Sequence, residues 1–312
     1  MAARIEAAVA LTSRGPRKPA ARRLADTAAG ACLTYAGRQP SDVDMLINTG
    51  LYREDNMGEP ALAALVQEDI GASPGHLPAG GHGTFSFDLL NGTCGVLNAI
   101  QLEAGMLRSG VIGLGAVVAS DVDPDGNARR PAMFQPAGGA LLLGWDDSAD
   151  GFTDFGAETF PEYADLFVSG LVWQEERRPG RRPGGRRRPR GRSRMVVDTR
   201  PGYHGRLVDC AEESAWRFLH RRGMEPGDID LLVLAPAGPD FCDPLRIRLG
   251  IPGDRVAYVS EELENAYTTG PIAALQAAIR SGRLAEARTT LLLAAGAGIT
   301  VTMALYRQAQ GC

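Results

Sequence analysis

Two stretches of the chain carry the same pattern of polar and apolar positions. Residues 40–47 read Pro-Ser-Asp-Val-Asp-Met-Leu-Ile, and residues 226–233 read Pro-Gly-Asp-Ile-Asp-Leu-Leu-Val. Each stretch follows a helical pattern, over residues 23–37 and 210–223, and ends in a short apolar run typical of a buried strand. A helix followed by a buried strand is therefore predicted twice.

A second pair of segments repeats in the same order. A helical stretch over 99–110 ends in Arg-Ser-Gly and precedes the apolar run 115–119, and a stretch over 273–282 ends in the same three residues before the run 291–295. Chance similarity between helix-turn-strand units is the alternative explanation, but two matched pairs in one order favour duplication. Helices that alternate with apolar strands predict an α/β fold, here in two similar halves.

An arginine-rich tract lies between the two halves. Residues 175–194 read EERRPGRRPGGRRRPRGRSR, which cannot form a hydrophobic core and predicts a disordered linker. Docking of an acidic carrier protein or of nucleic acid, and a reading-frame error in GC-rich DNA, are the alternatives. We therefore expect an N-terminal half over 1–174, a linker over 175–194 and a C-terminal half over 195–312.

Composition narrows the class of protein. The 312 residues are 44% hydrophobic, enough for a large core, while a net charge of -4 and 6% aromatic residues argue against nucleic-acid binding. No apolar run approaches the roughly 20 residues of a membrane helix, and we expect no signal peptide. The five cysteines are scattered without zinc-ligand spacing, so we expect reduced thiols, no metal site and a cytoplasmic location.

The best candidate for chemistry is Cys94. In the segment 87–97 an apolar strand enters a turn at Gly92, and the thiol then precedes Gly95 and a helical pattern over 96–107. A thiol at a helix N-terminus is expected to have a lowered pKa and thiolate character, which suits covalent catalysis on an acyl group. A buried structural cysteine in a turn of small residues is the alternative.

This segment resembles the active-site region of the ketoacyl-acyl-carrier-protein synthase III family, whose cysteine is acylated by a coenzyme A or carrier-protein thioester. Further similar segments are 109–121, 228–233, 282–284 and 291–307. The resemblance implies the thiolase fold, a layered αβαβα arrangement of two pseudo-duplicated halves with mixed central sheets. It also implies an acyltransferase that acts through an acyl-cysteine on Cys94, in lipid or specialised metabolism.

The sequence departs from the Cys-His-Asn triad of that family. Ala235 stands where the histidine belongs, whereas Asn265 fits the place of the asparagine. Histidine and asparagine polarise the thioester carbonyl in decarboxylative condensation, and losing one such donor typically costs about 10²–10³ in rate. Acyl transfer to another nucleophile is therefore favoured over malonyl condensation. A catalytically impaired partner subunit of a related condensing enzyme is the alternative function.

The resemblance extends to residues around the reaction. It implies an oxyanion hole from the Cys94 N–H and a glycine loop that contains Gly296 and Gly298, and no cofactor beyond the acyl-coenzyme A or phosphopantetheine thioester substrate. It also implies a homodimer, or a heterodimer with a related subunit, in which Glu59 would reach into the partner's site as a base. An ordinary loop carboxylate is the alternative for Glu59.

Three other side chains are weaker candidates. Tyr267 lies close to Asn265 and could donate a hydrogen bond, His82 lies in a glycine-rich stretch before Cys94, and His204 follows the arginine-rich tract. A flexible loop residue is the alternative for His82, and we expect His76 and His220 at surface positions, in a loop and at a helix end.

Overall fold

One ten-stranded sheet runs through the centre of the molecule and falls into two five-stranded halves with the same strand order, which we call the first and the second sheet. The computed structural model describes residues 2–13, 19–72, 82–124, 134–146, 150–175, 191–236 and 240–308. The first sheet has the order β3-β2-β4-β5-β1 and the second the order β10-β9-β11-β12-β6. The strands are β1 (Ala2–Thr12), β2 (Met45–Asn48), β3 (Phe85–Asp88), β4 (Leu114–Asp121), β5 (Ala137–Asp146), β6 (Gly151–Thr159), β9 (Leu231–Leu234), β10 (Val256–Ala257), β11 (Thr289–Gly296) and β12 (Thr300–Arg307).

The strand directions repeat as well as the order. Strand β2 is parallel to β3 and β4, and β5 is antiparallel to β4 and β1. In the second sheet β9 is parallel to β10 and β11, and β12 is antiparallel to β11 and β6. The predicted duplication and the mixed sheets are confirmed. Between β1 and β6 a single pair, Ala3 with Phe152, joins the two sheets within the described part of the chain.

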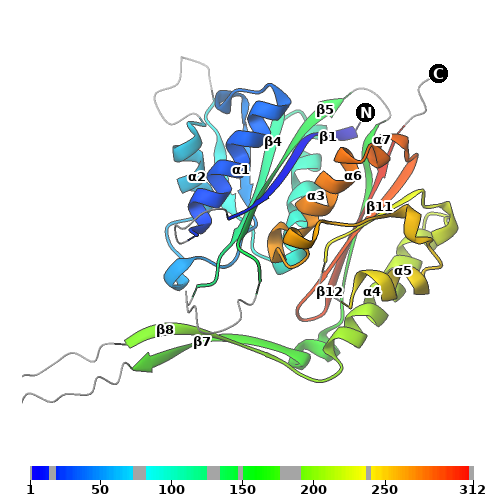
Figure 1. The fold of residues 1–312 in the computed structure, drawn as a ribbon. Helices are drawn as coiled ribbons and strands as arrows, with labels where there is room; N and C mark the ends of the chain where they lie inside the picture. The colour runs from blue at the N-terminus through cyan, green and yellow to red at the C-terminus, as the bar shows by residue number, and fades with distance from the viewer. Residues whose placement is uncertain are drawn as a thin grey trace, which may run out of the picture.

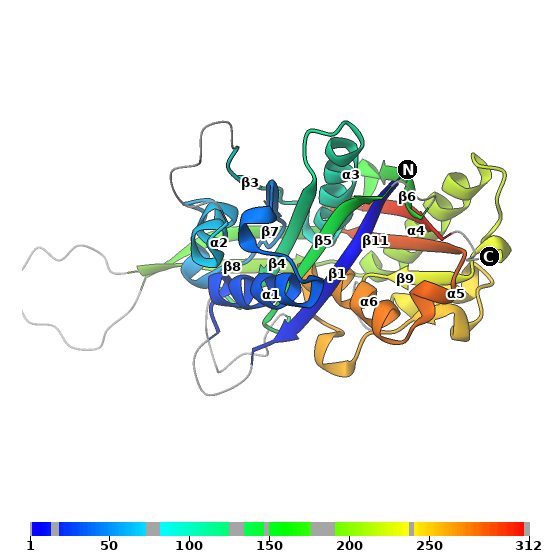
Figure 2. The same cartoon turned by 90° about the horizontal axis from the view of Figure 1, so that it is seen from above.

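The helices complete five layers (Figures 1 and 2). They are α1 (Ala21–Ala36), α2 (Leu62–Ile70), α3 (Gly95–Arg108), α4 (Tyr203–His220), α5 (Cys242–Arg248), α6 (Gly270–Arg280) and α7 (Arg283–Glu286). Helices α1 and α2 share a core with the outer face of the first sheet, and α4 and α5 share one with the outer face of the second. Helices α3 and α6 pack between the sheets, which gives the expected αβαβα arrangement.

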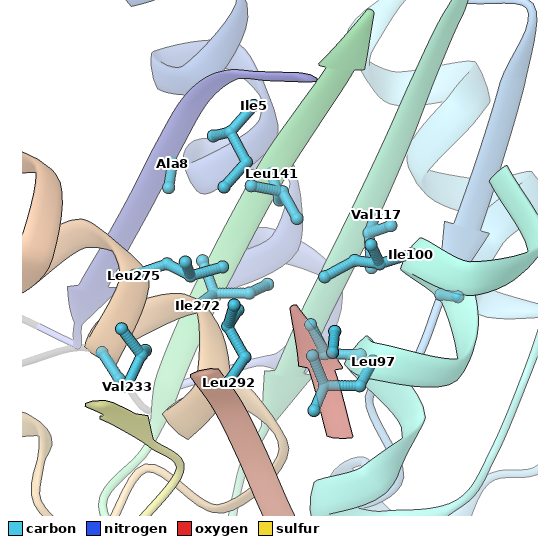
Figure 3. Packing of buried hydrophobic residues seen from close by; sticks show 14 of the residues in the cluster. Ile5, Ala8, Leu97, Ile100, Val117, Leu141, Val233, Ile272, Leu275 and Leu292 are labelled. Atoms are coloured by element: carbon cyan, nitrogen blue, oxygen red, sulfur yellow. The ribbon is translucent and has the colours of Figure 1, made fainter. Parts of the chain in front are cut away.

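The central core joins both halves. Figure 3 shows Leu97 of α3 and Leu275 of α6 among side chains of both sheets, such as Leu141 of β5 and Leu292 of β11. Each fully buried side chain of this size stabilises the fold by about 1.5–3 kcal/mol relative to exposure. The two halves are therefore one packed unit.

The repeated Asp-x-Asp motif has a defined structural role. Asp42 and Asp228 each accept a backbone N–H three residues earlier at 2.8 Å, and so cap a short 3-10 helix in both halves. The second aspartates, Asp44 and Asp230, accept the backbone N–H groups where β4 and β11 begin. The motif therefore fixes each buried strand against its neighbour.

A two-stranded ribbon projects from the second half beneath the first (Figure 1). It consists of β7 (Phe167–Glu175) and β8 (Gly191–Thr199), and the Asn56 amide donates to the Ser193 carbonyl at 3.3 Å. The expected linker thus begins and ends inside strands, and its centre, 176–190, lies outside the described residues. Strand β6 already belongs to the second sheet, so the halves divide before residue 151 and not at 174.

No helix in the described part of the chain combines the length and apolar character needed to cross a membrane.

Candidate active site

A pocket of about 640 Å³ opens where the two halves meet. Its walls come from the turn before α3, the segment before α6, the N-terminal residues of α4 and α5, the ribbon and the β11–β12 turn. The described residues that line it are Thr93, Phe167, Thr199, Tyr203, His204, Leu234, Pro236, Cys242, Asp243, Ala257, Tyr258, Val259, Glu264, Asn265, Tyr267, Ala295, Gly296 and Ala297. A concave, mostly apolar site with a few converging polar groups is typical of a small-molecule pocket.

Cys94 lies at the N-terminus of α3, as predicted, but its thiol does not line this pocket. The residue is 0% exposed, and its Sγ lies 3.3 Å from the Thr300 carbonyl oxygen and 3.7 Å from the Ala294 carbonyl oxygen. The sulfur is therefore turned toward the backbone of β11 and β12. Cys94 thus lies directly behind the lining residues Thr93 and Gly296.

The expected low pKa of Cys94 is wrong. Burial raises the pKa of the thiol to about 11, more than neighbouring donors such as the Thr302 and Thr93 hydroxyls lower it. The Cys94 N–H, expected in an oxyanion hole, donates to the Asn91 carbonyl at 3.0 Å. The sequence pattern placed the thiol correctly at a helix N-terminus but could not reveal that the thiol is buried.

Thr93 is the side chain of this turn that lines the pocket. Residues Gly92–Cys94 form a 3-10 helix, in which successive side chains point about 120° apart. Its hydroxyl donates to the Ala295 carbonyl at 2.5 Å, and Thr93 is 4% exposed. Sequence reasoning missed Thr93 because the neighbouring thiol is the stronger nucleophile; the 3-10 geometry was the signal that could have found it.

The β11–β12 turn gives the pocket room beside Thr93. Gly296 lines the pocket, and a Cβ on it would lie 2.9 Å from Thr93 Oγ1 and 3.7 Å from Cys94 Sγ. Gly298 has a φ of 89° and forms the turn, but is not among the residues that line the pocket. Of the two predicted glycines, Gly296 thus lies beside Thr93 and Cys94, and Gly298 shapes the loop.

Apolar residues surround position 235, where the resemblance would place a histidine. Ala235 is 2% exposed and its neighbours Leu234 and Pro236 line the pocket. Asn265 lines the pocket too, so the structure brings it near the turn that carries Thr93 and Cys94. His204 also lines the pocket, at the start of α4. His204 is thus an exposed residue that borders the pocket, and its functional role stays a prediction.

Tyr267, in the turn before α6, lies against the turn before α3. Its hydroxyl would lie 3.1 Å from a Cβ on Gly92, and its ring lies 5.3 Å from that of Tyr52 and 5.6 Å from that of Phe134. Burial raises the pKa of Tyr267 well above its usual value, so the phenol is neutral. It can donate a hydrogen bond, as the sequence suggested.

Glu59 and His82 lie away from the pocket in this chain. Glu59 is exposed in the loop before α2, and that loop is held by Arg53, which donates to the Pro60 carbonyl at 2.7 Å and pairs with Asp88 at 2.6 Å. His82 is exposed, with Nδ1 3.6 Å from Asp44. The reach of Glu59 into a partner's site stays a prediction. His76 lies outside the described residues.

No set of three or more His, Cys, Asp and Glu side chains could hold a metal ion within the ranges that the structure describes.

Comparison with known proteins points to one family. Residues 219–308 match the family model described as 3-oxoacyl-[acyl-carrier-protein (ACP)] synthase III C terminal. The beta-ketoacyl-[acyl-carrier-protein] synthase III of Thermosynechococcus vestitus is 28% identical over 291 residues, which is 91% of this chain and 82% of the relative. That of Solibacter usitatus is also 28% identical, over 92% of this chain and 83% of the relative.

Solved structures share the fold. Synthase III (FabH) from Pseudomonas aeruginosa has a TM-score of 0.73 at 20% identity, over the full length of both chains. A Xanthomonas campestris OleA structure with bound lauric acid and lauroyl-CoA has a TM-score of 0.76 at 16% identity, over 99% of each chain. The fold is thiolase-like. In sequence the chain is similar to beta-ketoacyl-[acyl-carrier-protein] synthase III proteins over most of its length.

Proposed function

We propose that this chain is an acyltransferase that takes an acyl group from a coenzyme A or acyl-carrier-protein thioester in the pocket between its halves. The proposal rests on one observation: the turn at the start of α3, Asn265, His204 and Gly296 all meet in that pocket. The curated relatives are named as synthases of the same substrate class. A cytoplasmic site of action, a homodimer or related heterodimer, and a role for Glu59 across that interface belong to the same proposal.

A heteroatom nucleophile fits this site better as the acyl acceptor than a malonyl carbanion does. An alanine methyl at position 235 cannot polarise a thioester carbonyl or stabilise an enolate, whereas the aminolysis or alcoholysis of an acyl group needs no enolate. His204, an exposed imidazole that borders the pocket, is the group that we propose to take the proton of such an acceptor. Transfer therefore fits the described side chains better than condensation does.

An acyl-cysteine on Cys94 has less support than the transfer itself. The thiol would have to leave two carbonyl contacts and a fully buried position before it met a thioester. The same burial, with Ala235, favours the second candidate function, a non-catalytic partner subunit of a related condensing enzyme.

Release of free coenzyme A distinguishes the two candidates. We expect the purified chain to release at least one equivalent of thiol per protomer from one member of an acetyl- to lauroyl-coenzyme A series. Gly296→Ala should slow this release about 10²-fold. The added methyl group would lie 2.9 Å from Thr93 Oγ1 and would displace a thioester bound beside Thr93. The matched control is Gly105→Ala in α3, where a Cβ meets nothing within 4 Å. Failure of all coenzyme A and acyl-carrier-protein thioesters to react would favour the partner subunit.

A further inference from the structure

We infer that the Thr302 hydroxyl is the hydrogen-bond donor that holds the Cys94 sulfur ready to accept an acyl group. Thr302 is thus a positioning residue, which acts through Cys94 and does not itself touch the substrate. The inference rests on the proposed acyl transfer, with Cys94 as the first acceptor of the acyl group. Three observations support it: the place of Thr302 in β12, its contrast with the corresponding residue of the first half, and the lack of a partner for its hydroxyl.

Thr302 lies on the face of β12 that points into the central layer. It is 2% exposed, and Ala304, two positions further along the same face, belongs to the core between the sheets. Its partner in β11 is Ala294, whose carbonyl oxygen lies 3.7 Å from Cys94 Sγ. The Thr300 carbonyl oxygen, two residues before Thr302, lies 3.3 Å from the same sulfur. The sulfur therefore lies against the segment of β12 that carries Thr302.

The first half contains a counterpart of Cys94. A 3-10 helix that ends at Thr269 precedes α6, as one that ends at Cys94 precedes α3. The Thr269 hydroxyl donates to the Ala119 carbonyl of β4 at 3.3 Å. Cys94 Sγ makes the equivalent contact with the Ala294 carbonyl of β11. Thr269 therefore corresponds to Cys94 in sequence order and in its contact with a strand.

The same correspondence shows what a side chain at position 302 meets. In the second half Ala294 pairs with Thr302 of β12. In the first half Ala119 pairs with Gly139 of β5, which therefore corresponds to Thr302. A Cβ on Gly139 would lie 3.0 Å from Thr269 Cγ2. The first half thus has a glycine directly beneath its turn, where the second half has a hydroxyl beneath the sulfur.

The Thr302 hydroxyl has no hydrogen bond of normal geometry to another described residue. A buried hydroxyl without a partner destabilises a fold. The Thr93 hydroxyl, which also adjoins the sulfur, already donates to the Ala295 carbonyl. Burial raises the pKa of the Cys94 thiol to about 11, and among the groups that lower it the Thr302 hydroxyl has the largest effect. The thiolate that forms when Cys94 reacts therefore supplies the acceptor that the Thr302 hydroxyl lacks.

The reaction that Thr302 assists is balanced without it. Cys94 Sγ forms a thioester bond to the acyl carbon as the C–S bond of the incoming thioester breaks, and the thiol proton ends on the departing sulfur. The Thr302 proton stays on its oxygen, and its hydrogen bond stabilises the negative charge on Cys94 Sγ before the new bond forms. The pocket adjoins the sulfur at Gly296, where a Cβ would lie 3.7 Å from Cys94 Sγ.

Single-turnover release of coenzyme A from octanoyl-coenzyme A tests the inference. Thr302→Val keeps the shape of the side chain and removes the donor, so we expect a rate constant about 10- to 100-fold lower at pH 7. The octanoyl-coenzyme A concentration that gives half the maximal rate should not change, because Thr302 does not touch the substrate. Thr302→Ser keeps the hydroxyl and should react as wild type does. Melting curves check that each variant is folded.

The matched control is Thr290→Val in β11. Thr290 is another fully buried threonine whose hydroxyl has no partner among the described residues, and it lies four residues before Ala294 on the same strand. The substitution is the same but is made away from the sulfur. We expect the wild-type rate constant for this variant.

Two results would overturn the inference while acyl transfer stands. One is a rate constant of Thr302→Val equal to that of wild type. The other is a folded Thr302→Ser that reacts as slowly as Thr302→Val, because the packing of β12 and not the hydroxyl would then matter.

Failure of the proposed function gives a different result, in which wild-type protein releases no coenzyme A. Alkylation of Cys94 by iodoacetamide, followed by peptide mass, then tests the hydrogen bond by itself. We expect Thr302→Val to be alkylated at Cys94 at least about 10-fold more slowly than wild type and Thr302→Ser to match wild type. Equal rates in wild type and Thr302→Val, or no alkylation of either, would overturn the inference.

Discussion

Replacing Asp121 with alanine is expected to lower the free energy of unfolding by about 3 kcal/mol at pH 7. The carboxylate is 0% exposed and accepts the backbone N–H groups of Leu51 at 3.1 Å, Tyr52 at 2.8 Å and Thr268 at 3.1 Å, together with the Thr268 hydroxyl. Alanine leaves these buried donors without their acceptor. They belong to both halves, so the loss also loosens the segment that carries Asn265 and Tyr267.

The pH dependence of this loss has a defined sign. Burial raises the pKa of Asp121 to about 6, although the four donors lower it. A group with a raised folded pKa stabilises the fold most below its unfolded pKa, near 3.9, and that contribution is lost as the pH rises through the folded pKa. The stability difference between wild type and Asp121→Ala should therefore grow between pH 6 and pH 4.

Urea unfolding at pH 7 and pH 5 measures both effects. The control is Asp198→Ala, an exposed carboxylate on β8, for which we expect a change within about 0.5 kcal/mol. Equal stability of Asp121→Ala and wild type at both pH values would show that the carboxylate does not stabilise the segments around Tyr52 and Thr268.

Glu103→Gln is expected to make the protein more stable than wild type in alkaline solution and to change it little near pH 4. Glu103 lies in α3 and is 0% exposed, and its two carboxylate oxygens have no hydrogen-bond partner among the described residues. They pack on β4, where a Cβ on Gly115 would lie 2.4 Å from one of them. Burial raises the pKa of Glu103 well above its usual value, so the folded protein holds the acid protonated.

The sign again follows from the raised pKa. Above the unfolded pKa of about 4.3 the unfolded chain releases this proton and the folded chain keeps it, so wild-type stability falls by up to about 1.4 kcal/mol per pH unit. Glutamine removes that slope. Urea unfolding from pH 4 to pH 8 measures it, with the exposed Glu261→Gln as control. Parallel curves for wild type and Glu103→Gln would contradict a protonated, buried acid.

The sequence was sufficient for the architecture because its signals there are local and repeated. The Asp-x-Asp motif predicts a strand start twice, and the structure explains both aspartates by backbone N–H groups that they accept. The αβαβα arrangement follows because the sheets of two similar halves have four apolar faces to bury. Strand β6 was assigned to the wrong half because its partner, β12, lies about 150 residues away in the chain.

The site was less predictable because it depends on which way neighbouring side chains face. Thr93 and Cys94 are adjacent, and the 3-10 turn decides that Thr93 lines the pocket and Cys94 does not, although both side chains contact backbone carbonyls. His204 reaches the pocket through the start of α4, far along the chain from Thr93. Neither its position nor the buried state of Cys94 has a signature in composition or spacing.

The single pair between Ala3 and Phe152 has a mechanical consequence. A single bridged pair gives little resistance to rotation of one sheet against the other. The angle between the sheets is therefore set by the side chains of α3 and α6 that pack between them. Because Thr93 reaches the pocket from the first half and its other described lining residues belong to the second, this packing also sets the width of the pocket. Under the proposed acyl transfer, changes in side-chain bulk on α3 and α6 would therefore change the acyl chain length that the pocket accepts.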